Sequence, residues 1–241
     1  MDYTNIDQNF FLKTLPALLS NAALVLYAIA RRPRLWRYLM LFGLTTLADI
    51  SVAGNLLPIA NPEVQTGIEY IFVLIGDLRF ILLLAYILYA GKTLADIDTL
   101  RLTGEVLRPA IIFMLFPSLI VSAIGFAKPE LLQLPRQRFL AYELVFFCLT
   151  LLWLKVVMPQ KPVADRERDF IRQVSLPVLG FYGLWAIADI LILRDMQIGY
   201  AVRILPNLLY YCLFLWWVAF ASREKISDIK GGAPYSSFHP D

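Results

Sequence analysis

The stretch IFVLIGDLRFILLLAYILYA, from Ile71 to Ala90, decides the class of this chain. It is almost continuously apolar, and it matches the roughly 20 residues that a helix needs to cross a hydrocarbon core of about 30 Å. Two charged residues, Asp77 and Arg79, lie within it. A soluble core does not accommodate many runs of this kind, so the stretch indicates a membrane-spanning helix.

The whole chain has the same character. Of its 241 residues 59% are apolar and only 17% are charged, which falls outside the usual composition of soluble proteins. Each long apolar run is expected to be a helix, because an open sheet edge leaves backbone groups unsatisfied in lipid. We therefore predict an all-α integral membrane protein with seven transmembrane helices in one domain, residues 1–222, and a short polar cytoplasmic tail, residues 223–241. The predicted spans are residues 11–30, 38–60, 68–90, 109–127, 139–158, 173–193 and 200–221.

Basic residues are distributed unevenly between alternate loops. Cytoplasmic segments of membrane proteins carry the excess of Lys and Arg, and this pattern predicts an N-terminus outside and a C-terminus in the cytoplasm. The more basic side holds Arg31, Arg32, Arg34, Arg37, Lys92, Arg101, Arg108, Lys161, Arg166, Arg168, Arg172, Arg223, Lys225 and Lys230. The opposite side holds Lys128, Arg136, Arg138 and Arg194.

Two similar octapeptides indicate an internal repeat. GLTTLADI, residues 43–50, and GLWAIADI, residues 183–190, each place one aspartate, Asp49 or Asp189, at the same position inside an apolar run. The order of helices and loops around each copy is also alike, which favours two parallel three-helix units related by an axis near the membrane normal. The units would comprise residues 11–92 and 139–222, joined by a linking helix at residues 109–127.

The charged residues inside these runs predict a polar site. A charge at mid-bilayer costs about 2.5–3.5 kcal/mol on insertion scales, so such residues should face the bundle interior and have partners. We expect Asp49 to meet Arg79, and Asp189 to meet Arg203. In the alternative interpretation each pair is only an internal tie that fixes helix orientation. The hypothesis is a cavity opening outward, lined by Asp49, Asp77, Arg79, Tyr182, Trp185, Asp189, Arg203, Asn207 and Tyr211.

Other chemistry is not indicated. Cys148 and Cys212 have no CxxC spacing, and the single histidine, His239, lies at the end of the chain. We therefore expect no disulfide framework, no metal site and no cofactor. The expected partners are membrane lipids and a small-molecule or lipid ligand rather than nucleic acid, and the pattern identifies no partner protein. The predicted location is a bacterial inner membrane.

The leading functional hypothesis is a carrier of a small solute or lipid-like molecule, coupled to protons. A retinal-binding pump is disfavoured, because it needs a lysine in the middle of the last helix and residues 200–221 contain none. The plan of three helices, one helix and three helices is similar to that of small sugar and vitamin carriers. The proline-glutamine motif of those carriers is absent, so only the architecture is shared.

Two alternatives stay open. The stretch IADILILRD, residues 187–195, followed by ILPNLLYY, residues 204–211, resembles the second acidic segment of lysoplasmalogenase-type membrane hydrolases, although the first segment and the helix count differ. That resemblance implies an intramembrane hydrolase in which Asp49 and Asp189 act as acid and base on water at a lipid ether. The third interpretation is a sensor or structural subunit of a membrane complex, in which the charged pairs only hold helices together.

Overall fold

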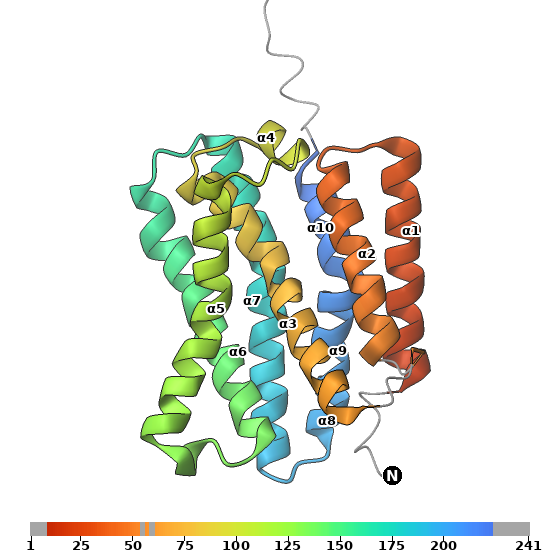
Figure 1. Cartoon of the computed structure of the whole chain (residues 1–241), viewed down its shortest axis with the longest axis vertical. Helices are drawn as coiled ribbons and strands as arrows, with labels where there is room; N and C mark the ends of the chain where they lie inside the picture. Colours follow the sequence, from red (N-terminus) through yellow and green to blue (C-terminus); the bar gives the residue numbers. More distant parts are fainter. Residues whose placement is uncertain (1–8, 54–55, 58–60, 224–241) are drawn as a thin grey trace, which may run out of the picture.

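A computed structural model describes residues 9–53, 56–57 and 61–223, and within these ranges the chain is helical with no strand. Figure 1 shows long helices that run alternately up and down in one bundle. The all-α membrane class is confirmed by six helical segments that are long and apolar enough to cross a membrane. They are Phe10–Arg31, Tyr70–Tyr89, Gly104–Ala127, Pro135–Gln160, Asp165–Leu193 and Ile198–Ala221.

The elements follow one another with short connections. The α-helices are α1 (Leu15–Arg31), α2 (Trp36–Ala53), α3 (Pro62–Leu84), α4 (Leu94–Asp98), α5 (Gly104–Ala127), α6 (Pro135–Leu152), α7 (Asp165–Leu193), α8 (Ile198–Val202), α9 (Ile204–Leu208) and α10 (Phe214–Ala221). The π-helical turns are η2 (Phe10–Thr14), η3 (Ala85–Tyr89), η5 (Trp153–Val157) and η7 (Leu209–Leu213), and the 3₁₀ turns are η4 (Pro129–Leu131) and η6 (Met158–Gln160).

Helix α2 corresponds to the predicted span 38–60. It has 18 residues, which include Arg37 and Asp49, and it is not among the six segments above. The helix nevertheless lies between α1 and α3 in the bundle (Figure 1), and it buries Tyr38 and Phe42. Residues 54–55 and 58–60 of the predicted span, like most of the predicted tail, lie outside the described residues, so the count of seven spans stays a prediction.

Helix α3 crosses the centre of the bundle (Figure 1). Every residue from 80 to 88, at the end of α3 and in η3, is at most 3% exposed, as expected for a helical segment that is apolar all round and enclosed by protein. Helix α5 is the opposite case, because only Val106, Ala110 and Pro117 among its 24 residues are buried. Its apolar surface is therefore available to lipid, whereas α3 carries Asp77 and Arg79 in the protein interior.

The last helical segment is interrupted where the sequence predicted one span. The segment consists of α8, α9, η7 and α10 in succession (Figure 1). Pro206 has no N–H and cannot continue an ordinary hydrogen-bond ladder, and the wider turn of η7 leaves backbone carbonyls for other donors. Three successive carbonyls accept hydrogen bonds from α1 and α3. The bonds are Ser20 Oγ to Cys212 O at 2.6 Å, Asn21 Nδ2 to Tyr211 O at 2.7 Å and Arg79 Nη1 to Tyr210 O at 3.4 Å.

Several helices extend beyond the predicted spans. Helix α7 begins at Asp165 rather than at residue 173, and α5 begins at Gly104 rather than at residue 109. The charged residues of these first turns indicated loops, but a helix can continue past the bilayer into water, where charged side chains are solvated. Hydropathy therefore located the apolar part of each helix and missed its end.

Candidate functional site

The carboxylate of Asp77 lies in the middle of the bundle. The residue is on α3 and is only 4% exposed. Its two oxygens accept hydrogen bonds from the hydroxyls of Tyr142 on α6 and Tyr182 on α7. A buried charge is costly unless it is hydrogen-bonded, and donors to a carboxylate form the stronger class of hydrogen bond. Asp77 therefore joins three helices through a polar centre.

Arg79 lies two residues further along α3 and is 2% exposed. Its Nε donates to Gly76 O at 2.8 Å, and Nη1 lies 3.3 Å from Thr46 Oγ1 on α2. The guanidinium carbon is 4.1 Å from the ring centroid of Tyr210 and 5.6 Å from that of Phe214, so the cation faces two aromatic rings. We call Asp77, Arg79, Tyr142, Tyr182 and Tyr210 the central cluster.

The Tyr210 side chain closes this cluster against α3. A β-carbon added at Gly76 would lie 1.7 Å from the Tyr210 hydroxyl oxygen and 3.0 Å from its Cζ. The Tyr210 ring also contacts the rings of Phe181 and Trp185, with centroids 5.2 and 5.1 Å away. A larger residue at position 76 would therefore force the Tyr210 hydroxyl to move.

Asp49 is half-buried on α2 and acts electrostatically on Arg79, Tyr210 and Tyr211. The predicted direct pair between Asp49 and Arg79 is not what the structure shows. Among the described residues, the guanidinium of Arg79 donates to neutral oxygens, and no carboxylate lies within 4.0 Å of its nitrogens. Asp49 is close enough to act electrostatically on Arg79, whose guanidinium stacks on the ring of Tyr210.

Asp189 anchors a second centre near the end of α7. It is fully buried, and its Oδ1 accepts a hydrogen bond from Arg203 Nη1, which joins the two residues as the sequence suggested. The same oxygen also lies 3.2 Å from Arg136 Nη1, in the first turn of α6. Two guanidinium groups therefore converge on one carboxylate oxygen.

Glu143 completes this centre. It lies on α6, is 5% exposed, and places Oε1 at 3.9 Å from Arg203 Nη1. Glu143 Oε2 and Asp189 Oδ2 are both buried, and neither has a hydrogen-bond partner in the part of the chain that the structure describes. We call Arg136, Glu143, Asp189 and Arg203 the four-charge cluster. It joins α6, α7 and the segment between α8 and α9.

The chain gives no match to any known family model, curated protein or solved structure. The two clusters are neighbours, because Tyr142 of the central cluster and Glu143 of the four-charge cluster are consecutive on α6. On α7, Tyr182 and Asp189 lie seven residues apart on one helix face, and each belongs to one cluster.

Trp185 lies between Tyr182 and Asp189 on this face of α7, and its Nε1 donates to Asn207 Oδ1 at 3.0 Å. Tyr182, Trp185 and Asp189 are spaced by three and four residues, which places them on one face of α7, and their contacts agree with this. The stripe faces the interrupted last segment, where Asn207 and Tyr211 lie. That all nine residues proposed from the sequence line one common cavity stays a prediction.

Three residues of the site were missed by sequence reasoning. The place of Glu143 near the start of the predicted span 139–158 favours an interfacial side chain that reaches toward water, and this prediction is wrong because the side chain is buried. Arg136 was counted as a loop residue, and Tyr142 was not considered. Arg136 and Glu143 are seven residues apart, a spacing that places them on one face of α6, and this was the available signal.

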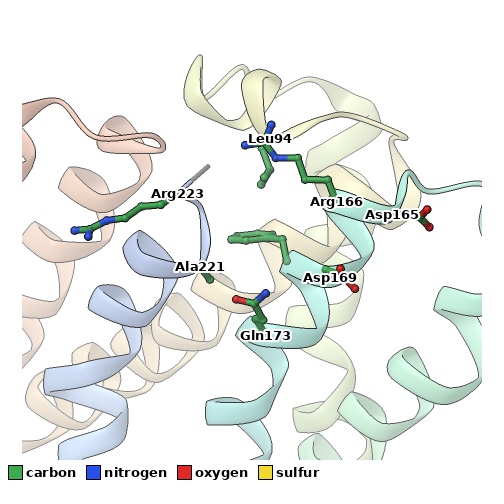
Figure 2. A pocket seen from close by; sticks show the side chains of 8 residues that line it. Leu94, Asp165, Arg166, Asp169, Gln173, Ala221 and Arg223 are labelled. Carbon is green, nitrogen blue, oxygen red and sulfur yellow. The ribbon is translucent and has the colours of Figure 1, made fainter. Parts of the chain in front are cut away.

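Two cavities occur at the end of the bundle that carries α4. One, of about 300 Å³, lies between α4, α7 and the end of α10, and the second, of about 350 Å³, lies between η3 and α5. In Figure 2 the charged side chains around the first cavity, including Arg223 and Asp165, point in different directions rather than converging on one ligand position. None of the nine residues predicted to line a cavity borders either space. Among the described residues, no group of three or more His, Cys, Asp or Glu side chains is placed to hold a metal ion.

Proposed function

We propose that this chain is a proton-coupled carrier of a small solute, with seven helices crossing the membrane and the N-terminus outside. The observation that carries the proposal is that two buried charge clusters border one interrupted helical segment. Intramembrane ionisable residues mark substrate or ion pathways, and in many carriers the site is formed by discontinuous helices near the bilayer midplane.

The orientation rests on the basic residues. The end of the bundle that carries α4 and the α6–α7 connection holds most of the Lys and Arg residues outside the apolar runs, and such ends face the cytoplasm. The four-charge cluster then lies toward the outer surface, and the central cluster lies deeper. The proposed pathway leads from Arg136 past Asp189 and Trp185 to Asp77 and Arg79.

The internal repeat remains part of this proposal. Helices α2 and α7 are the second helices of the two units, and each carries one aspartate, Asp49 or Asp189. The surroundings of the two aspartates differ. Asp189 binds two arginines, whereas Arg79, the residue expected to pair with Asp49, stacks on Tyr210. A duplicated carrier in which the two halves have taken different roles is compatible with these contacts.

The two-aspartate hydrolase is supported less well by the contacts. A general base needs a carboxylate that is available to water and substrate. Asp189 is fully buried and engaged by two guanidinium groups, so its carboxylate is not available to water or substrate. A purely structural role remains the main competitor, and it differs from the carrier in one measurable property, the accessibility of the pathway to water.

Cysteine accessibility tests the carrier. In a background with Cys148→Ala and Cys212→Ala, the variants Asn207→Cys and Ser175→Cys are exposed to a membrane-impermeant thiol reagent from each side. Both positions are buried, but Asn207 borders the proposed pathway and Ser175, on α7, does not. We expect labelling of Asn207→Cys from the outside, since the pathway opens there, and no labelling of Ser175→Cys. Equal lack of labelling at both positions, from both sides, would favour the structural role.

A further inference from the structure

We propose that Glu143 and Asp189 hold a single proton between them, bridging Glu143 Oε2 and Asp189 Oδ2. The inference deepens the proposed function, because it names the proton site that coupling requires. It rests on that function for its role in transport but not for the presence of the proton.

The hydrogen-bond pattern provides the first argument. Both arginines that reach Asp189 converge on Oδ1, so Oδ2 is left as a buried acceptor without a donor among the described residues. Glu143 faces Arg203 with Oε1, and its Oε2 is likewise a buried acceptor without a donor among the described residues. Both carboxyl groups face the same Arg203 nitrogen, so they are close neighbours. Two acceptors cannot satisfy each other, whereas a protonated carboxyl group provides a donor.

Burial makes the two unsatisfied carboxylate oxygens costly. Leaving a buried polar atom unsatisfied costs its full desolvation penalty, and the cost is greater for a charged group. One proton on Glu143 removes one buried negative charge and converts Oε2 into a donor for Asp189 Oδ2. The same step therefore satisfies both oxygens at once, without moving a helix.

Charge provides the second argument. The charge of Asp189 acts directly on Glu143, and two neighbouring carboxylates in one buried site resist ionising together. Arg203 lies within 4.0 Å of both carboxyl groups, and its side chain is 15% exposed. Arg136 is 28% exposed, so water screens part of its charge, and it also lies over the ring of Tyr200 on α8. The Asp189 anion takes the hydrogen bonds of both arginines, and Glu143 is left as the group that takes the proton.

The step is a simple proton transfer. A proton from water on the Arg136 side binds the Glu143 carboxylate to give the carboxylic acid, with no other reactant. When it leaves, Glu143 becomes an anion that competes with Asp189 for Arg203. The ion pairs that tie α6, α7 and the segment before α9 then change, and the change occurs beside Tyr142, whose hydroxyl binds Asp77. This gives protonation a direct mechanical effect on the pathway.

Infrared spectroscopy of the purified full-length protein in lipid nanodiscs tests the proton directly. The carbonyl stretch of a protonated carboxyl group is recorded as the pH is raised, for the wild type, Glu143→Gln and the control Glu130→Gln. Glu130 lies in η4, is well exposed and pairs with Lys128. We expect a band of one buried carboxylic acid in the wild type and in Glu130→Gln, and complete loss of that band in Glu143→Gln.

Each outcome decides the inference. A band that persists in Glu143→Gln, or no band in the wild type at any pH at which the protein is folded, overturns it. Failure of Glu143→Gln to fold also overturns it, because glutamine keeps the size, the neutrality and the hydrogen-bond donor of the protonated acid. Solute transport is measured separately on the same samples. The expected band without any transport leaves the proton site standing and retracts the carrier, so the two failures are distinguishable.

Discussion

Replacing Gly76 with alanine places a methyl group where the Tyr210 hydroxyl lies. The new carbon would be 1.7 Å from that oxygen and 3.0 Å from Cζ, far inside contact distance. Tyr210 cannot turn away without leaving Arg79, whose guanidinium carbon is 4.1 Å from the ring centroid. Overpacking of this kind costs about 1–3 kcal/mol. Gly67 provides a matched control on the same helix, because a β-carbon there meets no atom within 4 Å.

The assay is reversible unfolding in mixed detergent micelles, followed by circular dichroism. Both alanines gain the same helix propensity, about 1 kcal/mol over glycine, so the difference between the variants isolates the clash. We expect Gly76→Ala to be less stable than Gly67→Ala by about 1–3 kcal/mol. Adding Tyr210→Phe removes the oxygen and leaves the 3.0 Å contact with Cζ and an ordinary 3.6 Å contact with Arg79 Nη2, so the double variant should recover most of the loss. Equal stability of the two alanine variants would refute the packing described for the central cluster.

Two further predictions concern hydrogen bonds to carboxylates. Tyr182→Phe removes one hydrogen-bond donor from Asp77 and should lower the free energy of unfolding by about 1.5–3 kcal/mol. In an Asp77→Asn background the same substitution should lower it by less. An equal loss of stability in both backgrounds would exclude a direct hydrogen bond between Tyr182 and Asp77. At the exposed end of the bundle, the Thr93 backbone N–H and hydroxyl donate to Asp96 and hold its pKa below its usual range. Asp96 therefore adds stability above its unfolded pKa of about 3.9, and this is lost as the pH falls through the lower folded value. Thr93→Val should raise the Asp96 pKa measured by NMR titration, and a pKa equal to that of the wild type would contradict the role of the hydroxyl.

Local periodicity explains what the sequence could predict. The apolar run of α3 is long enough to identify a span by itself, and the spacing of Tyr182, Trp185 and Asp189 fixes a common helix face without knowledge of any neighbour. The pairing of Asp189 with Arg203 was also accessible, since both residues lie near the same end of consecutive helices. Such inferences need only the helix repeat and the rise per residue.

The remaining contacts depend on how helices are rotated against one another. Depth along a helix suggested that Glu143 reaches toward water, but depth carries no information on the direction of the side chain, and α6 turns it inward. Likewise Arg79 does not form the expected direct pair with Asp49, because its guanidinium lies over the ring of Tyr210 from η7. Pro206 indicates an interruption of the last helix, but the side chains that donate hydrogen bonds to η7 come from α1 and α3, which are remote in the sequence.

Transport by the purified protein tests the central claim most directly. Proteoliposomes with a proton gradient of either polarity are supplied with a panel of labelled amino acids, small carboxylates, sugars and lysophospholipids. The proposed function predicts that at least one solute accumulates above protein-free liposomes, that dissipating the gradient abolishes this accumulation, and that Glu143→Gln reduces it to background while Glu130→Gln does not. Absence of accumulation for every member of the panel, or equal gradient-driven uptake by Glu143→Gln and the wild type, would contradict the account of a carrier coupled to protons through the four-charge cluster.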